Sequence, residues 1–94
     1  KGSRMGRAGM DEIEQAVRAV LRHALGLSEA QVAAFHADTP LFGALPELDS
    51  MAVAGVLTEL EDRLGITIDD DDIDGDMLET FGALARFAAD KVAA

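Results

Sequence analysis

Apolar residues recur at helical spacing in three separate stretches of this 94-residue chain. The first stretch begins at Asp11 and ends before Gly26, a residue type typical of a left-handed C-cap. The second begins at Asp49 and Ser50, both good N-cap types, and the third follows Thr80. Each set forms one apolar face, so we predict three amphipathic helices. The apolar positions are, in chain order, Ile13, Val17, Val20, Leu21 and Ala24, then Val53, Val56, Leu57, Leu60 and Leu64, and finally Phe81, Leu84, Phe87, Ala88 and Val92.

The connections between these helices differ in character. Ser28 followed by Gln31 forms a capping box, which predicts a short helix or turn ending at Ala34. Residues 35–48 contain Asp, Pro and Gly residues typical of a loop, but the loop also carries apolar residues that we expect to pack against the core. Residues 66–68 alternate like a strand without a partner strand, so we predict an extended link and then an acidic loop or single turn over 69–78. The apolar residues of the first loop are Leu41, Phe42, Leu45 and Leu48.

These elements predict an all-α fold. We expect a small bundle of three main helices plus a short helix or turn, with a long ordered loop between the first and second main helices. The chain length fits one domain. Residues 1–9 mix Gly, Ser and Arg without an apolar period, which predicts a disordered lead or residues left from expression, so the domain is placed at residues 10–94.

The absence of cysteine excludes a disulfide framework, a thiolate metal site and a thiol nucleophile from the protein itself. No apolar run approaches the roughly 20 residues that span a bilayer, and the first ten residues lack the apolar stretch of a signal peptide. We therefore expect a cytoplasmic location, and we take the chain to be a monomer.

The net charge of -10 is concentrated in one part of the chain. Residues 45–79 carry twelve acidic residues and one basic residue, whereas residues 1–22 carry three acidic and five basic ones. Such acidity repels the phosphates of nucleic acids and of anionic membrane surfaces, so neither is expected as a partner. It favours basic protein partners, and it places any electrostatic docking face within residues 45–79.

The sequence Leu48-Asp49-Ser50-Met51, followed by an acidic amphipathic helix, resembles the acyl carrier protein family. The resemblance covers residues 10–94 and includes the loop sequence Thr39-Pro40-Leu41-Phe42. It implies that Ser50 is the attachment point of 4'-phosphopantetheine, with Asp49 and Met51 as motif neighbours. It also implies that a phosphopantetheinyl transferase attaches the arm, and that the carrier holds acyl groups as thioesters without catalysis of its own.

Physical chemistry is consistent with a phosphate at this position. The N-terminus of a helix offers unpaired backbone N–H groups and the positive end of the helix dipole, which stabilise an anion by about 0.3 to 1 kcal/mol. The competing interpretation is that Ser50 or Asp49 is only an N-cap. Because the reactive thiol would lie on the cofactor arm, the absence of cysteine is expected for a carrier.

Glu59, Glu61 and Asp62 lie on the second main helix away from its apolar stripe. They can be an ordinary solvated face, but the resemblance implies that such residues, with Val53, dock to basic patches of acyl-transferring or condensing enzymes. Residues 52–55 read Ala-Val-Ala-Gly, whereas carriers of fatty acid synthesis tend to be acidic there. This difference favours a specialised lipid or polyketide-type pathway, with partners that read shape and apolar contact near the arm.

Other interpretations remain open. Peptidyl carrier domains usually have Gly-Gly-His or Gly-Gly-Asp before the serine, where this chain has Glu47-Leu48-Asp49. A third reading is a protein-interaction module in which Ser50 is only a cap. His23 and His36 have no catalytic motif around them, so we expect no catalytic residues.

A calcium-binding helical module is the alternative from a different class. Asp70, Asp72 and Asp74 are spaced like the opening ligands of an EF-hand loop, and Gly75 follows them. The closing position is Phe81 instead of a glutamate, and Glu79 falls two residues early. We therefore expect no specific metal site.

Overall fold

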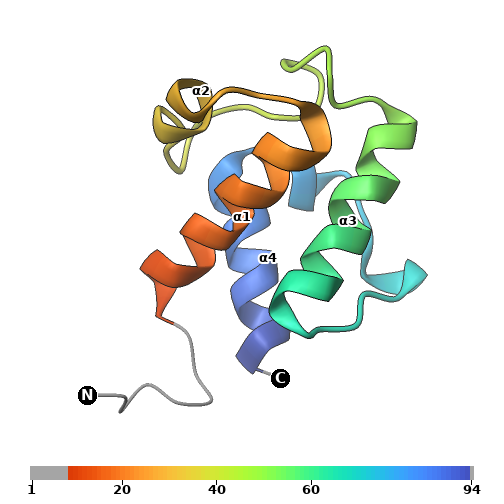
Figure 1. Cartoon of the computed structure of the whole chain (residues 1–94). Helices are drawn as coiled ribbons and strands as arrows, with labels where there is room; N and C mark the ends of the chain where they lie inside the picture. Colours follow the sequence, from red (N-terminus) through yellow and green to blue (C-terminus); the bar gives the residue numbers. More distant parts are fainter. Residues whose placement is uncertain (1–8, 94) are drawn as a thin grey trace.

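The computed structural model describes residues 9–93, which form four α-helices and two short 3-10 turns. Figure 1 shows α1, α3 and α4 around a common centre, and α2 lies beside the middle of α1, where Arg18 contacts it. The elements are α1 (Met10–Leu25), α2 (Glu29–Ala33), α3 (Ser50–Leu64), η1 (Asp70–Asp72), η2 (Asp76–Leu78) and α4 (Phe81–Ala93). The predicted all-α bundle is confirmed, and within residues 9–93 the extended pairing is limited to one isolated bridge between Pro40 and Thr80.

The expected lead, residues 1–9, falls almost entirely outside the described residues, which begin at Gly9. Gly9 itself is the N-cap of α1, and its backbone N–H donates to Glu12 Oε1 at 3.2 Å. Thus α1 begins one residue before the predicted Asp11.

The core is formed by the predicted stripes of α1, α3 and α4. Five predicted stripe residues are only half-buried at its edge, namely Ala24, Val53, Leu64, Phe87 and Val92. Ala85, which the stripe did not include, is fully buried. The buried helical residues are Ile13, Val17, Val20 and Leu21 of α1, Val56, Leu57 and Leu60 of α3, and Phe81, Leu84, Ala85 and Ala88 of α4. The three helices therefore enclose one core, which fixes the direction of α3.

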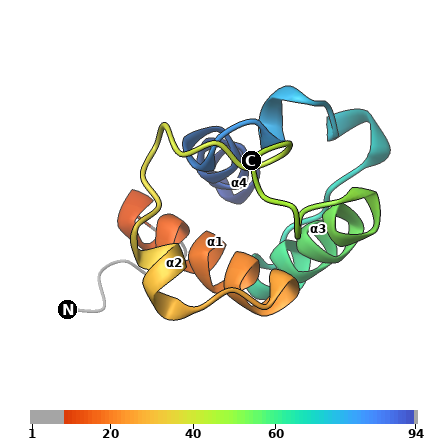
Figure 2. The ribbon, with the colours of Figure 1, turned by 90° about the horizontal axis from the view of Figure 1, so that it is seen from above.

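The long loop from α2 to α3 passes over α4, as seen from above in Figure 2. Leu41 and Leu48 are buried as predicted, and Leu45 is half-buried. The prediction was wrong for Phe42, whose side chain is 50% exposed. The backbone N–H groups of Leu41 and Phe42 donate to the carbonyl oxygens of Glu79 and Leu78, and the chain turns over residues 42–44, which leaves the Phe42 side chain at the surface.

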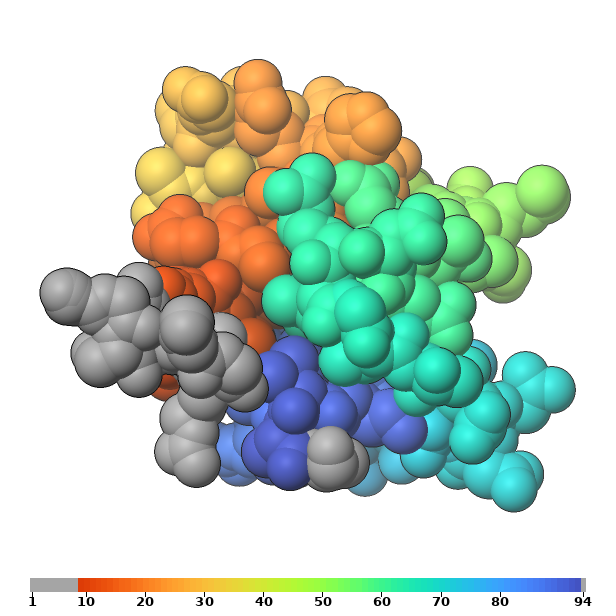
Figure 3. Space-filling model, turned by 60° about the horizontal axis from the view of Figure 1, so that its bottom comes forward, coloured from red at the N-terminus to blue at the C-terminus, as the bar shows by residue number. Residues whose placement is uncertain are grey.

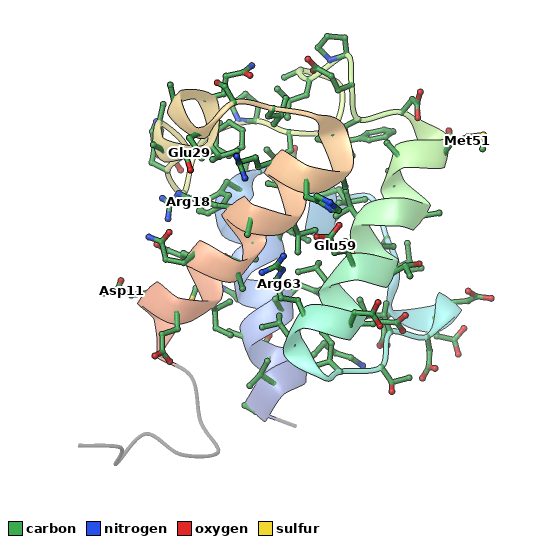
Figure 4. All side chains as sticks on the ribbon, viewed as in Figure 1. Asp11, Arg18, Glu29, Met51, Glu59 and Arg63 are labelled. Carbon is green, nitrogen blue, oxygen red and sulfur yellow. The ribbon has the colours of Figure 1, made fainter. Side chains whose placement is uncertain are left out.

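Arg18 of α1 fixes α2 and the start of the loop. Its Nε donates to the carbonyl oxygen of Val32 at 3.0 Å, and its Nη2 donates to that of Phe35 at 2.8 Å. The guanidinium carbon also lies 4.8 Å from the centre of the Phe81 ring. One arginine therefore joins α1, α2, the loop and α4, and the label in Figure 4 locates it between α1 and α2.

The acidic segment, defined here as residues 69–76, continues into the short turn η2. The sequence predicted an acidic loop or single turn over 69–78, and within it Met77 and Leu78 of η2 are buried against the core. These two apolar residues anchor one end of the acidic segment, which projects at the edge of the molecule in Figure 3.

Alanine substitutions at two helical glycines, Gly82 and Gly55, are expected to change the free energy of unfolding in opposite directions. A Cβ at Gly82 would lie 2.7 Å from the carbonyl oxygen of Ala37, whereas a Cβ at Gly55 would meet no atom within 4 Å. Gly82→Ala should therefore lower the free energy of unfolding by about 1 to 3 kcal/mol. Gly55→Ala should raise it by about 0.5 to 1 kcal/mol, because alanine has the better helix propensity. Urea unfolding of both variants measures this, and a stabilised Gly82→Ala variant would contradict the close packing at Ala37.

Candidate functional site

Ser50 is the first residue of α3, and its side chain is exposed. The N-cap is Asp49, whose Oδ1 accepts a hydrogen bond from the backbone N–H of Ala52 at 2.9 Å. The carbonyl oxygen of Asp49 accepts the bond from Val53 at 2.9 Å, which begins the helical ladder. Because Asp49 performs the capping, the Ser50 hydroxyl is left accessible at the positive end of α3.

Ser50 lies in the wall of a surface groove of about 370 Å³. The groove runs between the long loop, the start of α3 and the acidic segment. Its remaining lining residues are Phe42, Val53, Ile73, Asp74, Gly75 and Leu78. Most of this lining is apolar, and Asp74 supplies a negative charge.

Sequence reasoning predicted Ser50 and Val53 at the site but missed Phe42 and Ile73. No sequence signal separated Phe42 from the buried Leu41 beside it, because both are large apolar residues of the same irregular loop. Ile73 stands alone among six aspartates, so it had no apolar period to reveal its direction. Met51 projects into solvent with 83% of its surface exposed, as its label in Figure 4 shows.

The three acidic residues proposed for docking have different environments. Glu59 Oε1 lies 2.9 Å from His23 Nδ1, and Glu59 Oε2 lies 3.5 Å from Arg63 Nη2. Glu59 and Arg63 are labelled on α3 in Figure 4. Glu61 Oε2 accepts a 2.7 Å hydrogen bond from the backbone N–H of Ile68. Asp62 is exposed and has no ion pair with any described residue. Two of the three carboxylates are therefore engaged within the fold.

The aspartates that suggested a calcium loop make other contacts. Asp72 Oδ2 accepts hydrogen bonds from Lys91 Nζ at 2.8 Å and from the backbone N–H of Asp69 at 2.9 Å. Asp74 Oδ1 accepts from the backbone N–H of Met77 at 3.0 Å. Over residues 9–93 no three His, Cys, Asp or Glu side chains are grouped so that they could hold a metal ion. The acidic segment is thus fixed by a lysine and by backbone donors.

The Asp72–Lys91 pair predicts a pH dependence of stability. The hydrogen bond from Lys91, with that from Asp69, lowers the pKa of Asp72 below 3.8, and the same bond raises the pKa of Lys91 above 10.5. The lowered pKa of Asp72 stabilises the folded state above pH 3.8, and this stability is lost as the pH falls through the pKa of the folded protein. The raised pKa of Lys91 stabilises the folded state at lower pH, and this stability is lost as the pH rises through the pKa of Lys91 in the folded protein.

Asp72→Asn should therefore lower the melting temperature at neutral pH, and its difference from wild type should shrink below pH 3.8. The effect should be modest, because the pair is largely screened by solvent. Thermal melts across this range measure it, and Asp90→Asn, an exposed change on α4, is the control. A difference that grows with acidification would show that the pair is not formed.

No helix in the described part of the chain is long and apolar enough to cross a membrane.

Residues 15–88 match the family described as "Phosphopantetheine attachment site". The chain is similar to the solution structure of a holo acyl carrier protein from Nitrosomonas europaea, with 41% identity and a TM-score of 0.79. The match covers 87% of this chain and 96% of that protein. A comparison with curated protein sequences gave no significant match.

Proposed function

The chain belongs to the acyl carrier proteins of the phosphopantetheine attachment family, and we propose that Ser50 is the residue that carries its 4'-phosphopantetheine arm. The observation that supports this most strongly is the division of roles at the start of α3. Asp49 caps the helix with its carboxylate, and Ser50 presents an exposed hydroxyl beside the groove.

The local geometry suits a phosphodiester at Ser50. The first N–H groups of a helix have no intrahelical acceptor, and together with the helix dipole they favour an anion at that end. In the attachment step, Ser50 Oγ forms the new ester bond to phosphorus while the pyrophosphate bond of coenzyme A breaks. Adenosine bisphosphate leaves, and the hydroxyl proton passes to a base of the phosphopantetheinyl transferase. When bound, the arm supplies the thiol that holds an acyl group as a thioester.

The protein then acts as a carrier and not as a catalyst. Partner enzymes that transfer or condense acyl groups meet the arm near Met51 and Val53, and Asp62 is the α3 carboxylate left free for a basic partner. Glu59 and Glu61, which the sequence also suggested for docking, can contribute only if their internal contacts open. The absence of acidic residues from the first turn of α3 supports a role in a specialised lipid or polyketide-type pathway. We further propose that the carrier acts as a monomer in the cytoplasm.

A peptidyl carrier is the second candidate within the family. Acyl cargo is favoured over aminoacyl cargo, because the chain lacks the Gly-Gly pair before the serine and because the solved structure similar to it is an acyl carrier protein.

Attachment is tested by incubating the protein with coenzyme A, magnesium and a broad-specificity phosphopantetheinyl transferase, and then measuring the intact mass. We expect a gain of one phosphopantetheine per chain. An unchanged mass under conditions in which a known carrier is fully modified would refute the proposal.

A further inference from the structure

The acidic segment, residues 69–76, has one long-range polar contact with the rest of the described protein. No residue of the segment is buried in the hydrophobic core, although Ile68 before it and Met77 after it pack there. Its other hydrogen bonds are local and join residues three positions apart. The long-range contact is the bond from Lys91 Nζ of α4 to Asp72 Oδ2 at 2.8 Å. The segment is thus anchored at both ends and tied at its centre by one side chain.

The Lys91–Asp72 contact is also the most enclosed part of the segment. Asp72 has 31% of its side chain exposed, whereas the other residues of the segment are fully in the exposed class. The same oxygen of Asp72 accepts the backbone N–H of Asp69, so the ion pair is joined to the turn η1. Arg63 of α3 and Arg86 of α4 form no ion pair with the acidic segment. Lys91 is therefore the one described cation that holds it.

Charge and entropy both oppose the closed position of the acidic segment. Six of its residues are aspartates, and like charges crowded together repel one another. A segment with few buried apolar contacts and an exposed backbone also opens locally at a low free-energy cost. The Lys91 contact is therefore the interaction that decides whether the centre of the segment stays in place.

The acidic segment forms one wall of the groove beside Ser50. Residues 73–75, which directly follow Asp72, line this groove together with Ser50 and Val53. Figure 2 shows the connection that contains them crossing from α3 to α4 along the edge of the molecule. Movement of Asp72 away from Lys91 therefore displaces the wall that faces Ser50.

We propose that Lys91 and Asp72 form a latch that holds the acidic segment closed beside Ser50, and that opening of the latch releases this wall of the groove. Lys91 is a positioning residue, because it does not line the groove and acts on it through Asp72. The role of the latch rests on the proposed function, since the groove matters as the surroundings of the arm on Ser50. The ion pair itself does not depend on the arm.

NMR relaxation of the unmodified, ¹⁵N-labelled protein tests the latch. Lys91→Met removes the charge and the donors at a similar side-chain length. The backbone order parameters of Asp72 and Ile73 should fall from about 0.85, typical of a rigid backbone, to below about 0.6. Those of α3 should stay at the rigid value, which verifies that the variant is folded. Asp72→Asn, which removes the charge from the other side of the pair, should loosen the same residues.

Two substitutions on α4 are the controls. Lys91→Arg keeps a cation with hydrogen-bond donors, so the order parameters of the acidic segment should remain close to those of the wild type. Arg86→Met removes an exposed cation of the same helix that has no ion pair with any described residue, and it should leave the segment unchanged.

The link to the groove has its own readout. The amide chemical shifts of Phe42 and Val53, which line the groove from the loop and from α3, should change in Lys91→Met and stay constant in Arg86→Met. Unchanged order parameters in Lys91→Met, or an equal loss in Lys91→Arg, would overturn the latch. A loosened segment with constant Phe42 and Val53 shifts would overturn its link to the groove. None of these results depends on attachment at Ser50, which the intact mass tests separately.

Discussion

Replacing Phe81 with alanine is expected to lower the free energy of unfolding by about 3 to 5 kcal/mol. The ring is 1% exposed and lies 5.8 Å from that of Phe35, with the Arg18 guanidinium 4.8 Å above it. Its removal leaves a cavity where α1, the loop and α4 meet, and it also removes the cation–π contact. A loss of this size is a large share of the stability of a small domain, so urea unfolding would show a much lower midpoint.

Phe42→Ala is the matched control for this experiment. It removes the same side chain from a half-exposed position, so it should cost about 1 kcal/mol or less. Equal losses in the two variants would mean that Phe42 belongs to the core as Phe81 does, and would contradict its exposed position in the wall of the groove beside Ser50.

Ser50→Ala is expected to abolish attachment of the arm without destabilising the protein. The hydroxyl is the only atom lost, and the capping hydrogen bond belongs to Asp49, so the free energy of unfolding should change by less than about 0.5 kcal/mol. Intact mass after treatment with the transferase measures attachment, and a urea titration measures stability.

Ser28→Ala is the control that shows whether loss of the arm is specific to Ser50. Ser28 is also at the start of a helix, but there the hydroxyl itself accepts the capping hydrogen bond, from Gln31 at 3.1 Å. This variant should lose about 1 kcal/mol of stability and still accept the arm. Attachment that persists in Ser50→Ala but fails in Ser28→Ala would contradict the assignment.

The main features of the fold were predictable from sequence because helix signals are local. Gly26 and Gly65 end α1 and α3 with positive φ values of 72° and 66°, as expected for left-handed C-caps. The contact of Arg18 with the loop could not be predicted, because it joins residues up to 17 positions apart through backbone carbonyl groups that have no sequence signature.

The candidate site was predictable only in part. Asp49 and Ser50 combine two local signals, a helix start and a family motif, so both were found. Phe42 and Ile73 were missed because each depends on the tertiary course of an irregular segment. The contact between His23 and Glu59 could not be predicted for a similar reason, because it joins α1 and α3 across 36 residues of sequence.

The most direct test of the central claim is peptide mapping of the modified protein by tandem mass spectrometry. We expect the mass of one phosphopantetheine on the peptide that contains Ser50, with fragment ions placing it on Ser50 itself. Its location on Ser28, Thr58 or any other residue would contradict the account.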